Sequence, residues 1–278
     1  MRRFGVTEFT TVHASFEEDL AAYRAAGADG IGICELKLVE GRDREQLAAF
    51  RDSGLQASAC VPAVPSILPL PALPGPESPE ERVEAMIAGM RRLAPFEPAA
   101  FVCFTGPGRR EDVVEPLRVL ADEASRLGVP LALEPHNARF ASDWSIPATL
   151  DEAAALAEEA GGGIGLLFDV WHLWETPEVE EAIRRHAGAI VAVHVNDWRE
   201  PTRGWCDRAL PGAGIAPVET LVESLDTVGY DGFYDLEIFS DDGMFGNDYP
   251  DSLWRVPAEE LTRRGREAFN TTTTGGYA

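Results

Sequence analysis

Eight short apolar runs alternate with eight longer amphipathic segments along almost the whole chain, and this alternation restricts the fold more than any other feature. Most runs are continuously apolar, which is typical of strands buried on both faces of a parallel sheet. The predicted strands lie near Phe4, Ile31, Leu55, Phe101, Val129, Ile164, Val191 and Phe233. Such strands need helices on both faces of an open sheet, or a ring of helices around the sheet if it closes into a barrel.

The segments between the runs carry start and stop signals of helices. In residues 15–27, Ser15 is the expected N-cap, Glu18 completes a capping box, and Gly27 ends the helix. The other predicted helices cover residues 43–54, 78–93, 111–128, 149–162, 176–188, 216–229 and 256–269. Eight strand–helix units predict an α/β fold, a single (β/α)8 TIM barrel over residues 1–270, with residues 271–278 as a disordered tail.

Length and charge are compatible with this barrel and exclude several classes of partner. A chain of 278 residues allows two domains of ~150 residues, but a (β/α)8 barrel takes ~250 residues as one domain. Hydrophobic residues make up 45% of the chain, enough to build a large core. The formal charge of −23 argues against binding to nucleic acid or to an anionic membrane, and it suits a site for a divalent cation.

The sequence also predicts a cytoplasmic protein. Its first residues contain two arginines but lack the apolar segment of a signal peptide, and no apolar stretch approaches the ~18 residues of a membrane span. The four cysteines show no C-x-x-C spacing, so we expect buried free thiols in a reducing compartment.

Two connections are unusually long. Residues 62–79, rich in proline, follow the third predicted strand, and residues 197–211 follow the seventh. Both belong to the C-terminal face of the predicted barrel, where loops shape the substrate pocket.

Four ionisable residues interrupt apolar strands near their C-terminal ends, which converge on one mouth of a barrel. They occur on four consecutive strands and are Glu134, Asp169, His194 and Glu237. Three buried carboxylates repel one another unless a positive charge lies among them. Three oxygens and one imidazole suit a single hard divalent ion, with Mn²⁺ preferred and Mg²⁺ or Co²⁺ as alternatives, better than they suit structural zinc.

With these residues in place, the chain resembles the xylose isomerase-like barrel superfamily of sugar isomerases, epimerases and related dehydratases. The matching stretches are LEPHN, FDVWH, HVND, PGAGI and LEIF. The resemblance implies that the four residues bind the metal and that Glu134 and Glu237 are also the catalytic pair that transfers protons. It further implies that His172 contacts the substrate, that Arg208 binds substrate hydroxyls, and that the chain can form a homo-oligomer.

Further candidates for substrate binding lie beside these stretches, each with an alternative. Lys37 follows the second strand and reaches either the substrate or solvent. His136 and Asn137, just past Glu134, either line the pocket or support its residues. Trp171 and Trp198 flank the metal-binding stretches and form either an apolar wall for a sugar or ordinary loop packing.

The sequence departs from two branches of the superfamily. Phe140 lies six residues after Glu134, where the ketose 3-epimerases have a further substrate-binding acid, which weighs against specificity for free ketohexoses. The DNA-repair endonuclease branch needs extra histidines for three zinc ions, and the corresponding stretches GIGICEL, SACVPAV and FVCFTGP contain none.

The predicted function is therefore a divalent-metal-dependent sugar isomerase or epimerase with a small-molecule carbohydrate substrate. It would act on a keto-sugar or related polyol ketone by abstracting the proton next to the carbonyl, through a metal-stabilised enediolate. One alternative is a metal-dependent dehydratase or lyase that acts on a keto-inositol or keto-glycoside. The other is a non-catalytic sugar-binding barrel.

Overall fold

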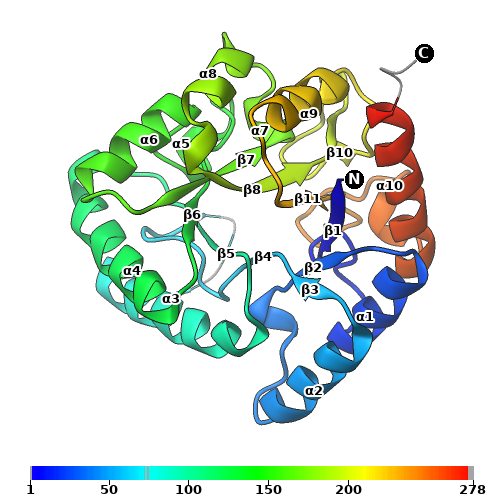
Figure 1. Cartoon of the computed structure of the whole chain (residues 1–278), viewed down its shortest axis with the longest axis horizontal. Helices are drawn as coiled ribbons and strands as arrows, with labels where there is room; N and C mark the ends of the chain where they lie inside the picture. The colour runs from blue at the N-terminus through cyan, green and yellow to red at the C-terminus, as the bar shows by residue number, and fades with distance from the viewer. Residues whose placement is uncertain (1, 72, 74, 275–278) are drawn as a thin grey trace.

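A computed structural model describes residues 2–71, 73 and 75–274, and it confirms the single barrel. Its parallel strands surround the centre of the molecule and its helices form an outer ring (Figure 1). The strands pair in the order β3, β2, β1, β11, β8, β7, β6, β5, β4. Their bounds are β1 Arg3–Thr7, β2 Gly30–Gly32, β3 Gln56–Ala57, β4 Ala59–Cys60, β5 Ala100–Cys103, β6 Leu131–Leu133, β7 Gly165–Asp169, β8 Ile190–Val195 and β11 Phe233–Leu236.

The third predicted strand is divided into β3 and β4, which together occupy one position in the barrel. β3 pairs with β2, whereas β4 pairs with β5. Ser58 separates them, yet its N–H donates to the Ile31 carbonyl (2.9 Å) and its carbonyl accepts from Ala99 (3.1 Å), so the ladder continues. Just past the break, the Ala59 N–H donates to the buried Asp235 carboxylate (3.4 Å). The barrel therefore closes through this bent strand.

All eight predicted helices are present, and three of them begin at a side-chain N-cap, made by Ser15, Ser78 and Thr149. The Ser15 side chain accepts from the Glu18 N–H while the Glu18 carboxylate accepts from the Ser15 N–H, which completes the predicted capping box. Helices α1 and α10 lie side by side and close the ring of helices (Figure 1). The eight helices are α1 Phe16–Ala25, α2 Asp43–Ser53, α3 Pro79–Leu93, α4 Val114–Leu127, α6 Leu150–Glu159, α8 Val179–Arg185, α9 Val218–Thr227 and α10 Ala258–Thr273.

Short helical turns occupy several connections that the sequence signals did not predict. Two of them, α5 and α7, follow strands on the face that holds the site residues. The turns are α5 Ala141–Trp144, α7 Val170–Leu173, η1 Glu35–Lys37, η2 Ala94–Phe96, η3 Arg110–Asp112, η4 Ala187–Ala189 and η5 Leu253–Arg255.

The last helix extends further than the sequence predicted. We expected disorder from residue 271, but α10 continues to Thr273, whose side chain is buried. The Thr273 hydroxyl donates to the Phe269 carbonyl (2.7 Å), and its own carbonyl accepts from the Arg2 guanidinium (2.7 Å). Residues 271–273 therefore belong to the barrel, and residues 275–278 of the predicted tail lie outside the described residues.

Two apolar layers hold the barrel together. The larger one lies between the strands and the outer helices, and the smaller one fills the barrel interior with short side chains. The buried interior residues are Ala59, Val61, Ala100, Val102, Ala132, Leu167 and Ala192. Because these side chains are small, the larger polar side chains near the strand ends have room above them. Among the described helices, none is both long enough and apolar enough to span a membrane.

The long connection after β8 is a hairpin and not an irregular loop. Strand β9 (Asp197–Trp198) pairs antiparallel with β10 (Arg208–Ala209), with Arg208 opposite Trp198. The hairpin returns the chain to the barrel mouth at Arg208. In the other long connection, residues 62–79, Pro74 and residue 72 lie outside the described residues.

Candidate active site

The four ionisable residues predicted from the strand ends meet at one point. Each offers one ligand atom, and these four atoms lie within 4.8 Å of one another, all on buried residues. Asp169 ends β7 and His194 lies within β8, whereas Glu134 and Glu237 directly follow β6 and β11. Neighbouring strands of the closed sheet therefore assemble a group that is scattered over a hundred residues of sequence.

Asp169 is held in a fixed orientation. Its Oδ1 accepts from the Trp171 N–H (2.8 Å), which begins the single turn α7, and from the Asn196 amide (2.9 Å). Its Oδ2 faces the cluster and accepts from Arg208 Nη1 (2.7 Å). One oxygen is therefore used for positioning while the other faces the shared site.

Arg208 supplies the permanent positive charge of the cluster. Its Nη1 donates to Asp169 Oδ2 and to Glu237 Oε2, both at 2.7 Å, and the side chain is buried. The guanidinium carbon lies 5.2 Å from the ring centre of Trp171 and 4.9 Å from that of Phe239. The β9–β10 hairpin thus brings Arg208 onto the predicted carboxylates, in agreement with its predicted place at the site.

The charges of this cluster leave room for two more positive charges. Three ionised carboxylates and one guanidinium sum to −2. Burial and the nearby Glu237 carboxylate raise the pKa of Glu134 to about 8. Burial alone would lower the pKa of His194, but Glu237 and the other carboxylates raise it to about 10. Protons on Glu134 and His194 balance the cluster, and one divalent cation would balance it equally well.

His194 is the clearest sign that the cluster suits a metal ion. Its Nδ1 lies 3.2 Å from Glu237 Oε2 and 3.9 Å from both Glu134 Oε1 and Asp169 Oδ2. Neither ring nitrogen has an aligned hydrogen-bond partner among the described residues, although both are buried. A buried polar atom without a partner is costly, and an imidazole nitrogen is a common metal ligand. The donor set therefore fits a divalent cation.

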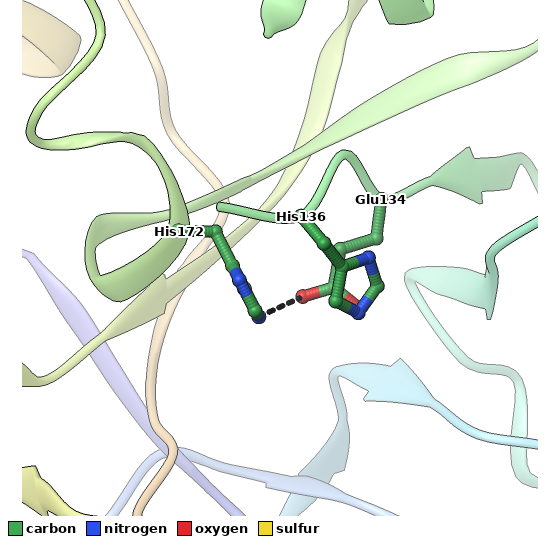
Figure 2. A group of neighbouring side chains, drawn as sticks. All are labelled: Glu134, His136 and His172. Atoms are coloured by element: carbon green, nitrogen blue, oxygen red, sulfur yellow. Dashed lines mark ion pairs between the residues drawn. The ribbon is translucent and has the colours of Figure 1, made fainter. Parts of the chain in front are cut away.

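His172 and His136 stand beside Glu134 as neutral imidazoles. Figure 2 shows His172 pointing at the Glu134 carboxylate, with Nε2 3.9 Å from Oε1. The Asn137 N–H donates to His172 Nδ1 (3.0 Å), and Arg208 Nη2 lies 3.2 Å from His172 Nε2, so both ring nitrogens face N–H donors. Burial lowers the pKa of His172 well below its usual value, helped by His136 and Arg208, and burial lowers that of His136 to about 4.

A cavity of about 200 Å³ opens directly on this cluster. Five of the predicted catalytic or substrate-binding side chains and the predicted metal ligand His194 line it. These six polar lining residues are Glu134, His136, His172, His194, Arg208 and Glu237. A small molecule in the cavity would therefore meet a carboxylate pair, imidazoles and a guanidinium together.

Lys37 lies outside the described lining of the cavity, and its ammonium is paired within the protein and not with solvent. The Lys37 ammonium donates to the buried Asp19 carboxylate and to the Thr11 carbonyl (2.8 Å). Its neighbour Leu36 lines the cavity instead. Because η1 begins immediately after β2, the chain turns there and presents the preceding residue to the mouth.

Three further predicted contacts belong to the support of the site. Trp171 and Trp198 are fully buried with ring centres 4.7 Å apart, and both lie outside the described lining of the cavity. This position favours loop packing over an apolar wall for a sugar. Asn137 also lies outside that lining: its N–H orients His172, and its amide donates to Glu175 (3.4 Å).

Sequence reasoning missed two residues that position the site. Asn196 holds Asp169, as described above. Asp197 accepts from the N–H groups of Trp198 (2.8 Å), Gly214 and Ala216 (both 2.9 Å) and so fixes the PGAGI stretch. Both are polar residues directly after a buried strand, a signal present in HVND but given no role.

Comparison with known proteins agrees with this fold. The chain belongs to the xylose isomerase-like TIM barrel family, whose profile matches residues 20–272. It matches none of the curated proteins compared with it.

Several solved structures share the barrel along its whole length. A protein from Sinorhizobium meliloti 1021 is 24% identical, with 98% of this chain and 99% of that chain covered and a TM-score of 0.83. The IOLI protein with a binding zinc atom is 17% identical, with 99% of each chain covered and a TM-score of 0.78. D-Psicose 3-epimerase from Clostridium cellulolyticum H10 is 18% identical, with 97% and 98% covered and a TM-score of 0.77.

Proposed function

We propose that the protein is a divalent-metal-dependent isomerase or epimerase that acts on a keto-sugar or a related polyol ketone. The observation that carries this proposal is the buried cluster of four ligand atoms within 4.8 Å of one another, three of whose residues, Glu134, His194 and Glu237, line the cavity. Glu134, Asp169, His194 and Glu237 would hold the cation. Three carboxylate oxygens and one nitrogen favour a hard ion, and we propose Mn²⁺ ahead of Mg²⁺ or Co²⁺.

The chemistry follows from the groups that face the cavity. A divalent cation in this cluster would withdraw electron density from a substrate carbonyl and so make the neighbouring C–H more acidic. Glu134 and Glu237 line the cavity and are the carboxylates available to take up and return that proton. Arg208 also lines the cavity with a guanidinium that can donate to a substrate hydroxyl, and the His172 imidazole, with Nε2 3.2 Å from Arg208 Nη2, lies beside it to contact a second oxygen.

The same proton removal leads to three products. A proton returned to the opposite face of the same carbon gives an epimer, and one returned to the adjacent carbon gives an isomer. Loss of a β-hydroxyl gives the dehydration product, and bond cleavage would indicate a lyase. Two of the similar structures are of a D-psicose 3-epimerase and an L-ribulose 3-epimerase, which supports epimerisation or isomerisation as the first choice.

Proton exchange in D₂O tests the proposal directly. The metal-loaded protein should incorporate deuterium next to the carbonyl of a keto-sugar, keto-inositol or sugar-acid probe, as measured by NMR. The NMR spectrum of the product then shows whether the reaction is epimerisation, isomerisation, dehydration or cleavage. Glu134→Gln and Glu237→Gln should each slow exchange by about 10²–10⁴-fold. Glu115→Gln, on the exposed surface of α4, is the matched control.

Exchange that survives both chelation and Glu237→Gln would overturn the mechanism. Tight binding of a sugar without metal and without exchange would instead indicate a non-catalytic binding barrel. Cleavage products without isomers would indicate the lyase.

A further inference from the structure

The cavity has a polar floor and an apolar wall. Beyond the six polar side chains of its floor, every other described lining residue is apolar. Val102 lies in β5 and the others lie in the connections that follow several different strands. The residues are Phe9, Val12, Leu36, Val61, Pro65, Leu73, Val102, Phe104, Phe140, Trp144, Trp205, Phe239, Met244, Phe245 and Trp254. The wall therefore differs in chemistry from the floor on which the reaction is proposed to occur.

Aromatic rings form a continuous path along this wall, from the floor outwards. Trp144 stacks on His136 at the floor, with ring centres 5.9 Å apart and planes at 12°. Trp205 follows at 4.9 Å from Trp144, and it contacts Phe239 at 5.8 Å and Phe245 at 4.9 Å. We name Trp144, Trp205, Phe239 and Phe245 the aromatic wall.

The indole N–H of one lining tryptophan already donates hydrogen bonds within the protein. The Trp254 indole N–H donates to the backbone carbonyls of Phe9 and Ile238, both at 2.9 Å. Trp254 therefore offers a ligand its ring and not a hydrogen bond. Its ring lies 6.1 Å from both Phe239 and Phe245 and extends the apolar surface.

The apolar surface continues to the rim of the cavity. Leu36 is 70% exposed and Met244 is 48% exposed, although both are large apolar side chains. Exposed apolar residues grouped at a cavity mouth are typical of ligand contact. Leu36 follows β2 and Met244 follows β11, so they reach the mouth from separate loops.

A substrate made only of hydroxylated carbons could place a C–H face on these rings, but its hydroxyl groups would find no partners along the rest of the described wall. Hydroxyl groups pressed against it would lose water without gaining hydrogen bonds, which is costly. An aromatic ring has no hydrogen bonds to water to lose at this wall, and its burial and its contact with the other rings are favourable. A cavity of ~150 Å³ accepts benzene, so about 200 Å³ with an open apolar rim accommodates a ring and its link to the polar floor.

We propose that the substrate carries an aromatic group joined to its hydroxyketone head, with the ring against the aromatic wall and the head at the polar floor. The position of the hydroxyketone head in this inference rests on the proposed function, and the position of the aromatic ring rests on the lining of the cavity. It makes the aromatic wall the determinant of specificity.

Two matched hydroxyketones test the inference. 1-Hydroxy-4-phenylbutan-2-one and 1-hydroxybutan-2-one share one head and differ by one ring. Deuterium exchange at the hydroxymethyl carbon of the metal-loaded protein, read by NMR, should show a kcat/KM at least about ten-fold higher for the phenyl compound, because burying a ring is worth at least that factor. Trp205→Ala and Trp205→Leu should each reduce this ratio toward one, and Val119→Ala, an exposed apolar residue on α4, should leave the ratio unchanged.

A binding measurement gives a readout that does not depend on turnover. In saturation-transfer NMR, 4-phenylbutane-1,2-diol should bind more tightly than butane-1,2-diol, both with and without metal, and Trp205→Leu should remove the difference. Equal exchange and equal binding of the paired probes would overturn the inference and leave the proposed function standing. Preferential binding of the phenyl compound without exchange of either ketone would support the inference and overturn the proposed function.

Discussion

Replacing Arg208 with methionine tests how the carboxylate cluster is stabilised. In the protein without metal, the change removes the two 2.7 Å hydrogen bonds to Asp169 and Glu237 and leaves both carboxylates buried with one positive partner fewer. The methionine stem can still pack between the rings of Trp171 and Phe239, so loss of charge and not loss of volume dominates. Breaking a buried ion pair costs about 3–5 kcal/mol of the free energy of unfolding.

This cost can be measured as a change in melting temperature. At this chain length, 1 kcal/mol corresponds to about 2 °C, so Arg208→Met should lower the Tm by about 6–10 °C in the presence of a chelator. A divalent cation supplies the lost positive charge, so adding Mn²⁺ should reduce the difference in Tm between the variant and the wild type.

Differential scanning calorimetry with and without Mn²⁺ measures both effects. Arg263→Met, which removes only exposed ion pairs on α10, is the control and should melt close to the wild type. A variant that melts within about 1 °C of the wild type under chelation, or a gap that Mn²⁺ leaves unchanged, would refute the charge argument.

Two further variants test the supporting residues. Asn196→Ala removes the amide that orients Asp169, and it should weaken Mn²⁺ binding by about 10–100-fold in a calorimetric titration; unchanged affinity would show that Asp169 does not need this contact. Lys37→Met leaves the buried Asp19 carboxylate without its ammonium partner and should cost about 3–5 kcal/mol of stability in urea unfolding. The same variant should have an unchanged KM for substrate. A raised KM would show that Lys37 contributes to substrate binding.

The fold could be predicted because its signals are local and repeated. Each apolar run of strand length is followed by an amphipathic helix, and the start of some of these helices is marked by a cap, as at Ser15 with Glu18. The four clustered residues could be predicted for a related reason. The C-terminal ends of barrel strands converge on one mouth, so Glu134, Asp169 and their two partners were expected to meet there.

What could not be predicted depends on the path of the loops. Lys37 lies two residues past Glu35, and the turn η1 directs it to Asp19 and away from the mouth. The aromatic wall was missed for the same reason. Aromatic residues in loops have no periodicity that tells which of them face the cavity, as the contrast between Trp205 and the buried Trp198 shows.

The most direct test of the central claim is deuterium exchange on one preparation in three states. The protein is assayed with 1-hydroxy-4-phenylbutan-2-one in D₂O as purified, after chelation, and after return of one equivalent of Mn²⁺. Exchange at the hydroxymethyl carbon should disappear on chelation and return with the metal, because the carboxylates alone cannot make that C–H acidic enough. Exchange that continues at its full rate after chelation would contradict the account.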